Sequence, residues 1–325
     1  LPSLGAGNYS SIASGLQDDG SSTFKPSVVL AIADGDNTVA YSEDADTWLT
    51  SSLPGSLNTS GENTVAFGQI TSTVARFVVI SDIDQDVAYS DNGGQTWSIT
   101  GTALPANGYG EMVYGAGKFV AINSGTTSAA YSADGVTWTG VTAPAAFAAV
   151  TNIVWGNGKF VALGGTNGIM YSLDGVTWVV NALTLPLTVT ERKLAYGQGT
   201  FVVTTDDTDE VQYSHDGLYW QAYTLTGTGS TGGHNAIAFG NPAQEGKFVM
   251  LLPGAGTAGK YAKINTPAKG RASVANEQIF AIRITEPGSG YTSAPTITIT
   301  DPNNVDDVVL VPQIGNGVLA NPTFN

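Results

Sequence analysis

The stretch at residues 131–138, YSADGVTW, decides the fold because the chain carries five versions of it. The other four are residues 41–48 (YSEDADTW), 89–97 (YSDNGGQTW), 171–178 (YSLDGVTW) and 213–220 (YSHDGLYW). Their tryptophans recur roughly every 40–50 residues, a period typical of repeated four-stranded sheets. The repeat predicts an all-β fold, a β-propeller of four-stranded blades.

Each repeat unit is predicted to form four short strands. In the unit around the fourth copy, apolar and small residues alternate over 152–156, 158–163, 168–172 and 177–180. Glycine and aspartate bound these stretches, as they bound half-buried strands. Four antiparallel strands per unit form one blade.

Six such units are expected, and the two terminal ones are atypical. The first lacks the aromatic-Gly strand that opens the others, and the sixth loses its turn and tryptophan after residue 262. A seventh blade is possible if residues 1–24 or the tail complete it. The domain prediction is a propeller over 1–269 and a small β module over 270–325, with strands at 278–285 and 294–300.

Composition argues against several partner classes. The formal charge is −15, from 12 basic and 27 acidic residues, which disfavours nucleic acid and anionic membranes as partners.

The chain has no cysteine, so neither disulfides nor thiolate metal sites are expected. No apolar run is long enough for a membrane helix, which predicts a soluble protein. The start at Leu1 suggests processing or excision from a longer chain.

The repeated turn is expected to be structural. A short Asp or Asn side chain accepts backbone N–H groups in a loop, glycine permits positive φ, and tryptophan packs across the strands. The residues assigned to this role are Ser42, Asp44, Trp48, Ser90, Asn92, Gly94, Trp97, Ser132, Asp134, Gly135, Trp138, Ser172, Asp174, Gly175, Trp178, Ser214, Asp216, Gly217 and Trp220.

These turns resemble the Asp-box of the bacterial neuraminidase repeat, found in sialidases, sortilin-type receptors, a photosystem assembly factor and phage virion proteins. The resemblance covers residues 25–265. It implies a propeller in which the turns lie away from the active face. The chain departs from the usual form: Asn92 replaces Asp, residues 45–46 replace the glycine region of the first copy, and three copies are one residue shorter.

Catalytic readings find little support in the residues. A sialidase needs an arginine triad, and Arg76, Arg192, Arg271 and Arg283 lack the family's setting. The histidines, His215 and His234, have no partner at a recognised spacing. We therefore expect no catalytic residues, no cofactor and no enzyme activity, although a propeller glycosidase that uses two carboxylates stays open as a third reading.

Acidic residues gather in the loops between second and third strands, at Asp34, Asp36, Asp82, Asp84, Asp86, Asp206, Asp207, Asp209 and Glu210. These loops are expected on one face, opposite the repeated turns. Asp82, Asp84 and Asp86 are weak candidates for a divalent metal site. They resemble the start of a calcium loop but lack its glycine and distal glutamate.

The tail at residues 288–299, GSGYTSAPTITI, resembles a β repeat of tailed-phage virion proteins, especially from phages of cyanobacteria. This resemblance implies a virion structural protein in tail, fibre or capsid surface. Its partners would be other virion proteins or copies of itself, and a host-surface glycan is possible. A secreted or cell-surface glycan-binding propeller is the alternative.

Overall fold

A computed structural model gives the structure of this chain. It describes residues 9–16, 27–33, 35, 37–55, 57, 61, 63–100, 103–142, 144, 150–164, 168–181, 193–204, 210–224, 236–240, 247–251, 259–262, 269–275, 278–286, 297–299, 308–310, 314–315 and 318–319. Every regular element in these ranges is a β-strand, which confirms the all-β prediction. None of the described residues belongs to a helix long and apolar enough to cross a membrane.

The first three sheets have four strands each, paired antiparallel in chain order. Sheet one contains β1 (Tyr9–Leu16), β2 (Ser27–Ala33), β3 (Thr38–Ser42) and β4 (Leu49–Ser52). Sheet two contains β5 (Asn63–Gln69), β6 (Ala75–Ser81), β7 (Val87–Ser90) and β8 (Ser98–Ile99). Sheet three contains β9 (Tyr109–Gly115), β10 (Lys118–Asn123), β11 (Ser128–Ser132) and β12 (Thr139–Thr142).

Sheets four and five repeat this order, whereas sheet six has three strands among the described residues. Sheet four contains β13 (Asn152–Gly156), β14 (Lys159–Gly164), β15 (Gly168–Ser172) and β16 (Val179–Val180). Sheet five contains β17 (Leu194–Gly197), β18 (Thr200–Thr204), β19 (Glu210–Ser214) and β20 (Gln221–Thr224). Sheet six contains β21 (Ala236–Gly240), β22 (Lys247–Leu251) and β23 (Gly259–Ala262).

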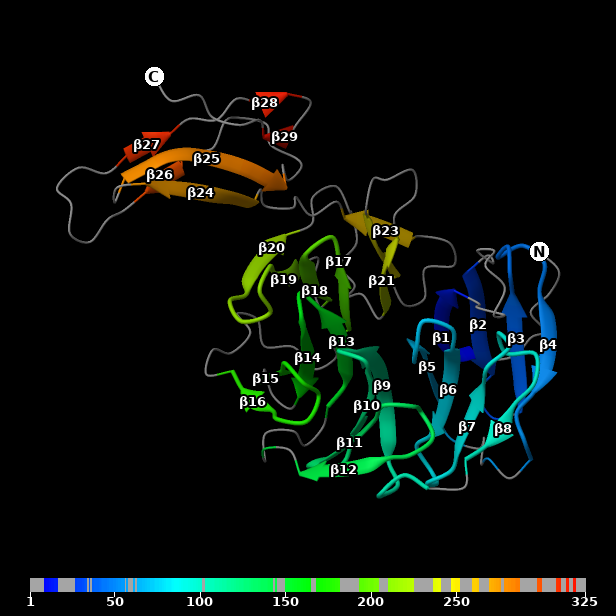
Figure 1. Ribbon diagram of the computed structural model, residues 1–325. Helices are drawn as coiled ribbons and strands as arrows, with labels where there is room; N and C mark the ends of the chain where they lie inside the picture. The colour runs from blue at the N-terminus through cyan, green and yellow to red at the C-terminus, as the bar shows by residue number, and fades with distance from the viewer. Residues whose placement is uncertain are drawn as a thin grey trace.

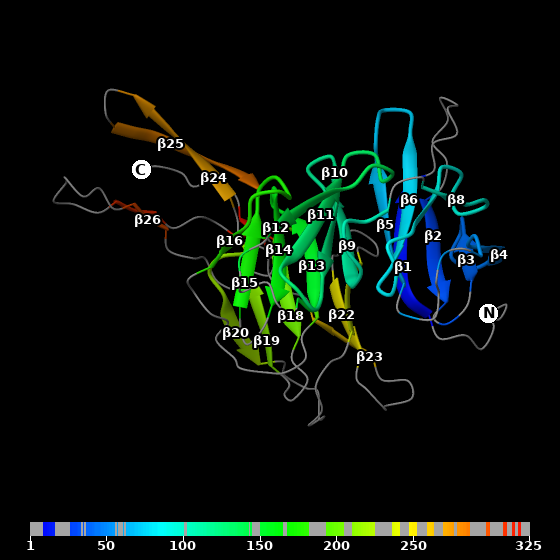
Figure 2. The ribbon, with the colours of Figure 1, turned by 90° about the horizontal axis from the view of Figure 1, so that it is seen from below.

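The tail forms separate two-stranded sheets. Their strands are β24 (Lys269–Ala275) with β25 (Gln278–Glu286), β26 (Ile297–Ile299) with β27 (Val308–Leu310), and β28 (Ile314–Gly315) with β29 (Val318–Leu319). In Figures 1 and 2, β24 and β25 lie outside the group formed by the six larger sheets. The domain boundary near residue 270 stays a prediction.

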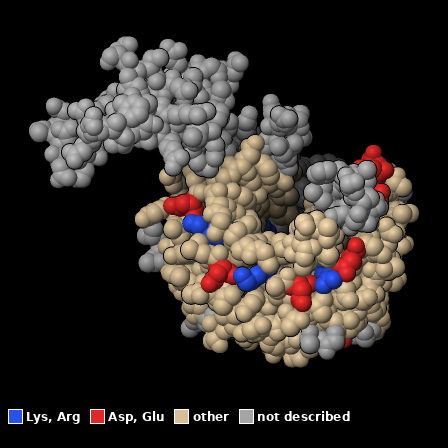
Figure 3. Space-filling view, viewed as in Figure 1, with Lys and Arg blue, Asp and Glu red and all other residues tan. Residues whose placement is uncertain are grey.

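The six larger sheets are arranged around a common centre (Figure 1). Their first strands face the middle, and β5, β9, β13 and β17 each contact the first strands on both sides. Figure 3 shows a hollow near this middle. In sheets three to five the second strands are almost wholly buried, so the core lies in the layers between neighbouring sheets.

Neighbouring sheets pack by placing an aromatic ring over a glycine. In sheet four, Trp155 covers Gly115 of sheet three, where an added Cβ would meet the ring at 2.3 Å. The same arrangement joins Phe67 to Gly15, Tyr114 to Gly68, Tyr196 to Gly156 and Phe239 to Gly197. The recurring aromatic-Gly pair therefore serves two junctions, because its ring packs on the preceding sheet and its glycine receives the next ring.

This arrangement corrects the prediction that the first unit lacks its opening strand. The strand is β1, and Gly15 marks it by accepting Phe67 of sheet two. Ser14 stands where the other units have an aromatic residue, and it is exposed. Part of residues 1–24 thus completes sheet one rather than a seventh sheet.

The junction between sheet six and sheet one differs from the other five. Ile12 of sheet one is 67% exposed, whereas Ile153 at the same position in sheet four is 5% exposed. On the other side, Val249 of sheet six is 43% exposed, whereas Val120 and Val161 are fully buried. Sheets six and one therefore do not bury against each other the side chains that join the other sheets.

Candidate binding site

The five repeated turns are here numbered in chain order. They are turn one (Ser42–Trp48), turn two (Ser90–Trp97), turn three (Ser132–Trp138), turn four (Ser172–Trp178) and turn five (Ser214–Trp220). In turn three, Ser132 Oγ donates to Asp134 Oδ1 at 2.9 Å and accepts the Gly135 N–H at 2.8 Å. Asp134 Oδ1 also accepts the N–H groups of Val136 and Thr137 at 2.8 and 2.7 Å. The carboxylate thus holds the backbone of its own turn.

These hydrogen bonds lower the pKa of the turn aspartates. The Thr177 N–H lowers the pKa of Asp174, burial opposes it, and the resulting pKa is about 2. Backbone N–H groups of turn one likewise lower the pKa of Asp44 to about 2. For Asp134 and Asp216, burial raises the pKa, but backbone hydrogen bonds outweigh it. These carboxylates are therefore ionised at neutral pH and engaged by their own turns.

The turn tryptophans pack between sheets. Trp138 is 9% exposed and joins the cluster that sheets two and three form, while Trp178 is 7% exposed and packs between sheets three and four. Trp97 Nε1 donates to Ser51 Oγ in sheet one at 3.2 Å. Each of these indoles therefore fastens its sheet to the preceding one.

A cation at the start of the second strand ties some sheets to the next turn. Arg76 Nη1 donates to the carbonyl of Asp134 in turn three at 2.7 Å, and Lys159 Nζ donates to that of Asp216 in turn five at 2.7 Å. Most Lys and Arg side chains visible in Figure 3 lie beside Asp or Glu. In sheet one, Val28 occupies this position and is buried.

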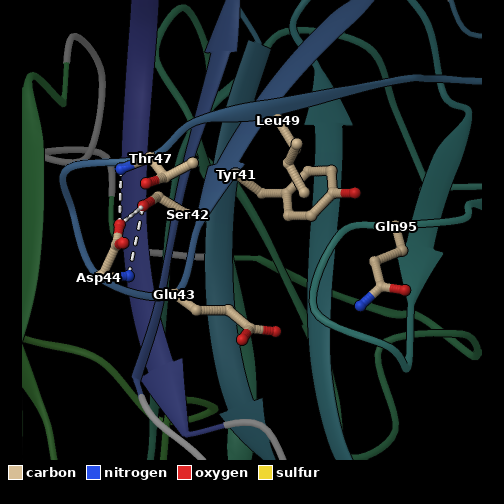
Figure 4. A pocket seen from close by; sticks show the side chains of 7 residues that line it. All are labelled: Tyr41, Ser42, Glu43, Asp44, Thr47, Leu49 and Gln95. Atoms are coloured by element: carbon tan, nitrogen blue, oxygen red, sulfur yellow. Dashed lines mark hydrogen bonds between the residues drawn. The ribbon is translucent and has the colours of Figure 1, made fainter. Parts of the chain in front are cut away.

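A pocket opens between turn one and turn two, where sheet one lacks this cation. Its volume is about 380 Å³. The lining residues are Tyr41, Ser42, Glu43, Asp44, Thr47, Leu49 and Gln95. Figure 4 shows the Asp44 carboxylate turned back toward Thr47, whereas Glu43 and Gln95 extend beside the ring of Tyr41. Besides the turn-bound Asp44, the polar groups of the pocket thus include the carboxylate of Glu43, the amide of Gln95 and the hydroxyl of Tyr41.

Two features of the local sequence create this pocket. Turn two is one residue longer than turns three to five, and this longer turn carries Gln95. Leu49, the first residue of β4, is 56% exposed at the pocket. An exposed apolar side chain, an aromatic ring and a few polar groups form the lining typical of a ligand site. The sequence signal that could have located it is the combination of Val28 with Glu43, because Val28 and Thr200 stand where four sheets have a basic residue, and only Val28 is paired with a carboxylate after Tyr-Ser.

The structure does not bring the predicted metal candidates together. No group of three or more acidic or histidine side chains suited to a metal is found among the described residues. Asp84 Oδ1 accepts the N–H of Asp86 at 3.0 Å and so holds its own loop. Asp82 lies at the start of this loop. Five of the other acidic loop residues lie outside the described residues, namely Asp34, Asp36, Asp206, Asp207 and Asp209. Glu210 is described and begins β19.

His215 lies in turn five and has a structural contact. Its Nδ1 lies 3.0 Å from Thr200 Oγ1, and burial lowers its pKa. His234 and Arg192 lie outside the described residues, while Arg271 and Arg283 lie in the tail strands β24 and β25. Among the described residues, Arg76 is therefore the one arginine that lies in the larger sheets.

Known structures share this arrangement at low sequence identity. YCF48 from Cyanidioschyzon merolae is 12% identical with a TM-score of 0.56, and the match covers 99% of this chain and 97% of that one. YCF48 bound to D1 peptide is 15% identical with a TM-score of 0.53, over 81% and 79% of the two chains. Virginiamycin B lyase from Staphylococcus aureus is 11% identical with a TM-score of 0.55, over 69% and 73%. The chain has a β-propeller fold.

No protein-family model matches the chain, and no curated protein does. The lyase corrects the prediction that the chain is not an enzyme, because the same fold carries an enzyme in that case. The argument from the arginines concerns sialidase chemistry alone and not catalysis in general. At these identities the likeness establishes the fold alone.

Proposed function

We propose that the chain is an interaction protein whose propeller binds a partner polypeptide at the pocket between turns one and two. The observation that carries this proposal is the pocket itself, in which Leu49 stays 56% exposed beside the ring of Tyr41. A binding surface commonly combines such an apolar anchor with a few polar groups. A structural neighbour bound to a peptide supports a polypeptide as the ligand.

The propeller would be the displayed part of a phage virion component, and the tail would attach it. Support for this setting comes from the resemblance of residues 288–299 to virion β repeats. The edges of two-stranded sheets favour pairing with other chains, since a lone pair of strands leaves hydrogen-bonding groups unpaired. Virion proteins or further copies of the chain would then be the partners of the tail, with the virion as its location.

Binding of the purified chain to peptide arrays and glycan arrays tests the proposal. We expect peptide binding that Leu49→Asp abolishes, because a carboxylate replaces the exposed apolar anchor. Leu173→Asp is the matched control, since Leu173 is 64% exposed in turn four, away from the pocket. Binding to glycans alone, or equal loss with both variants, would contradict a polypeptide site at the pocket.

A further inference from the structure

Sheet two shows how this fold holds a guanidinium group. Arg76 Nε and Nη2 donate to the two carboxylate oxygens of Asp91 at 2.6 and 2.8 Å. The Arg76 guanidinium carbon also lies 4.3 Å from the ring centroid of Tyr89. A bidentate carboxylate and an aromatic face are two strong partners for this cation. The contact with Asp91 accordingly raises the pKa of Arg76.

Sheet one keeps both of these partners and lacks the arginine. Tyr41 pairs with Leu30 as Tyr89 pairs with Val78, so the two tyrosines hold the same position. Glu43 follows Tyr41-Ser42 as Asp91 follows Tyr89-Ser90, and it supplies the carboxylate. The position of Arg76 is occupied by Val28, because Val28 pairs with Gly15 as Arg76 pairs with Gly68.

The ring and carboxylate of sheet one instead line the pocket. Val28 is 1% exposed and too short to reach them. No Lys or Arg is among the pocket residues, and Gln95 adds an amide that can accept a further hydrogen bond. The pocket of sheet one therefore lies at the place that corresponds to the Arg76 guanidinium in sheet two.

We propose that this pocket binds an arginine side chain of the partner polypeptide, in the arrangement that Arg76 adopts within sheet two. The inference rests on the proposed function and names the chemistry that the pocket recognises. The partner guanidinium donates to the Glu43 carboxylate and stacks on the ring of Tyr41. This guanidinium, from another chain, makes the contacts with Glu43 and Tyr41 that Val28 is too short to make.

The comparison with sheet four favours arginine over lysine. There Lys159 stands at the Arg76 position, 6.0 Å from the ring centroid of Tyr171. The residue that follows Tyr171-Ser172 is Leu173, so sheet four has no carboxylate at this place. In sheet two, the residue that follows Tyr-Ser is the carboxylate Asp91, and its partner at the start of the second strand is an arginine, Arg76. Glu43 therefore matches a guanidinium, which can form two parallel hydrogen bonds.

Calorimetric titration of the full chain with N-acetylarginine methylamide tests the inference, with the citrulline analogue as the uncharged control. We expect one site for the arginine derivative and at least about tenfold weaker binding of the citrulline derivative, since it lacks the charge. Glu43→Gln should weaken arginine binding about tenfold, whereas Tyr41→Phe, which keeps the ring, should change it little. Equal binding of both ligands, or binding unchanged by Glu43→Gln, would overturn the inference.

Two exchanged substitutions provide a sharper test. Val28→Arg should fill the pocket from within and abolish binding of the arginine derivative. Arg76→Val should open the corresponding space at Tyr89 and Asp91 and raise the number of binding sites from one to two. Circular dichroism identifies a variant that fails to fold, in which case Glu43→Gln alone decides. If peptides bind without any preference for arginine, the inference fails while the proposed function stands. If the arginine derivative binds and no peptide does, the proposed polypeptide partner is wrong, and only the recognition of a guanidinium group by the pocket stands.

Discussion

Gly175 in turn four lies directly against Val120 of the preceding sheet, where an added Cβ would come within 2.6 Å of Val120 Cγ2. The same contact joins Gly135 to Val78 and Gly217 to Val161. Gly175 also has a φ of +73°. Glycine is therefore required in these turns twice over, once by the backbone and once by packing between sheets.

Replacing Gly175 with alanine should destabilise the fold strongly. The left-handed backbone costs about 1–2 kcal/mol for alanine, and overpacking against Val120 adds about 1–3 kcal/mol. Ala45 in turn one is the natural control, because it holds the glycine position at φ +60° and is exposed. Ala45→Gly should change the free energy of unfolding by less than about 1 kcal/mol. Denaturant titration measures both, and similar values for the two variants would refute the packing argument.

The exposed junction between sheets six and one predicts unequal costs for the same substitution. Ile153→Ala should lower the free energy of unfolding by about 2–5 kcal/mol, because Ile153 is buried between sheets three and four. Ile12→Ala should lower it by less than about 1 kcal/mol, because Ile12 is 67% exposed. Urea unfolding curves compare the two variants. A large loss with Ile12→Ala would show that this junction is packed like the others.

Trp138→Ala should cost about 3–5 kcal/mol of unfolding free energy, since the indole fills the layer between sheets two and three. Trp48 in turn one is less buried, so Trp48→Ala is the matched control and should cost clearly less. Thermal unfolding followed by circular dichroism gives the comparison. Equal losses would mean that burial between sheets does not set the cost.

The lowered pKa of Asp174 predicts a loss of stability in acid. Its pKa is about 2 in the folded chain, against about 3.9 in an unfolded one. The contribution is therefore complete above about pH 4 and is lost as the pH falls toward 2. Asp174→Asn should remove this dependence, because Asn92 accepts the same kind of hydrogen bonds in turn two without titrating. The difference in unfolding free energy between wild type and variant, measured at pH 5 and pH 2.5, should shrink at the lower pH; a constant difference would contradict the assignment.

The proposed role of the tail predicts separable functions. A chain shortened to end near Gly270 should keep the propeller folded, since the sheet junctions described above lie before that residue. The shortened chain should no longer enter phage particles, because it lacks the strands proposed for attachment. Circular dichroism checks the fold, and immunoblotting of purified particles checks incorporation. Normal incorporation of the shortened chain would show that the tail does not attach it.

Part of the candidate site could be read from the sequence and part could not. The repeated turns, their glycines and the cation of the second strand are local patterns that recur, so comparing the units reveals them. The pocket arises where one unit departs from the pattern. Val28 in one strand and Gln95 in a turn of the next sheet acquire a shared role only when the two sheets are packed together.

The sequence by itself determined the all-β repeat, because the spacing of Tyr-Ser turns and tryptophans follows from local strand and turn preferences. It also located the glycines that need positive φ. Only the tertiary structure revealed that Gly15 opens the first sheet, because that glycine is defined by the ring of Phe67 from the next sheet. The exposed junction and the pocket beside Tyr41 were likewise decided by contacts between sheets, which depend on residues distant in the chain.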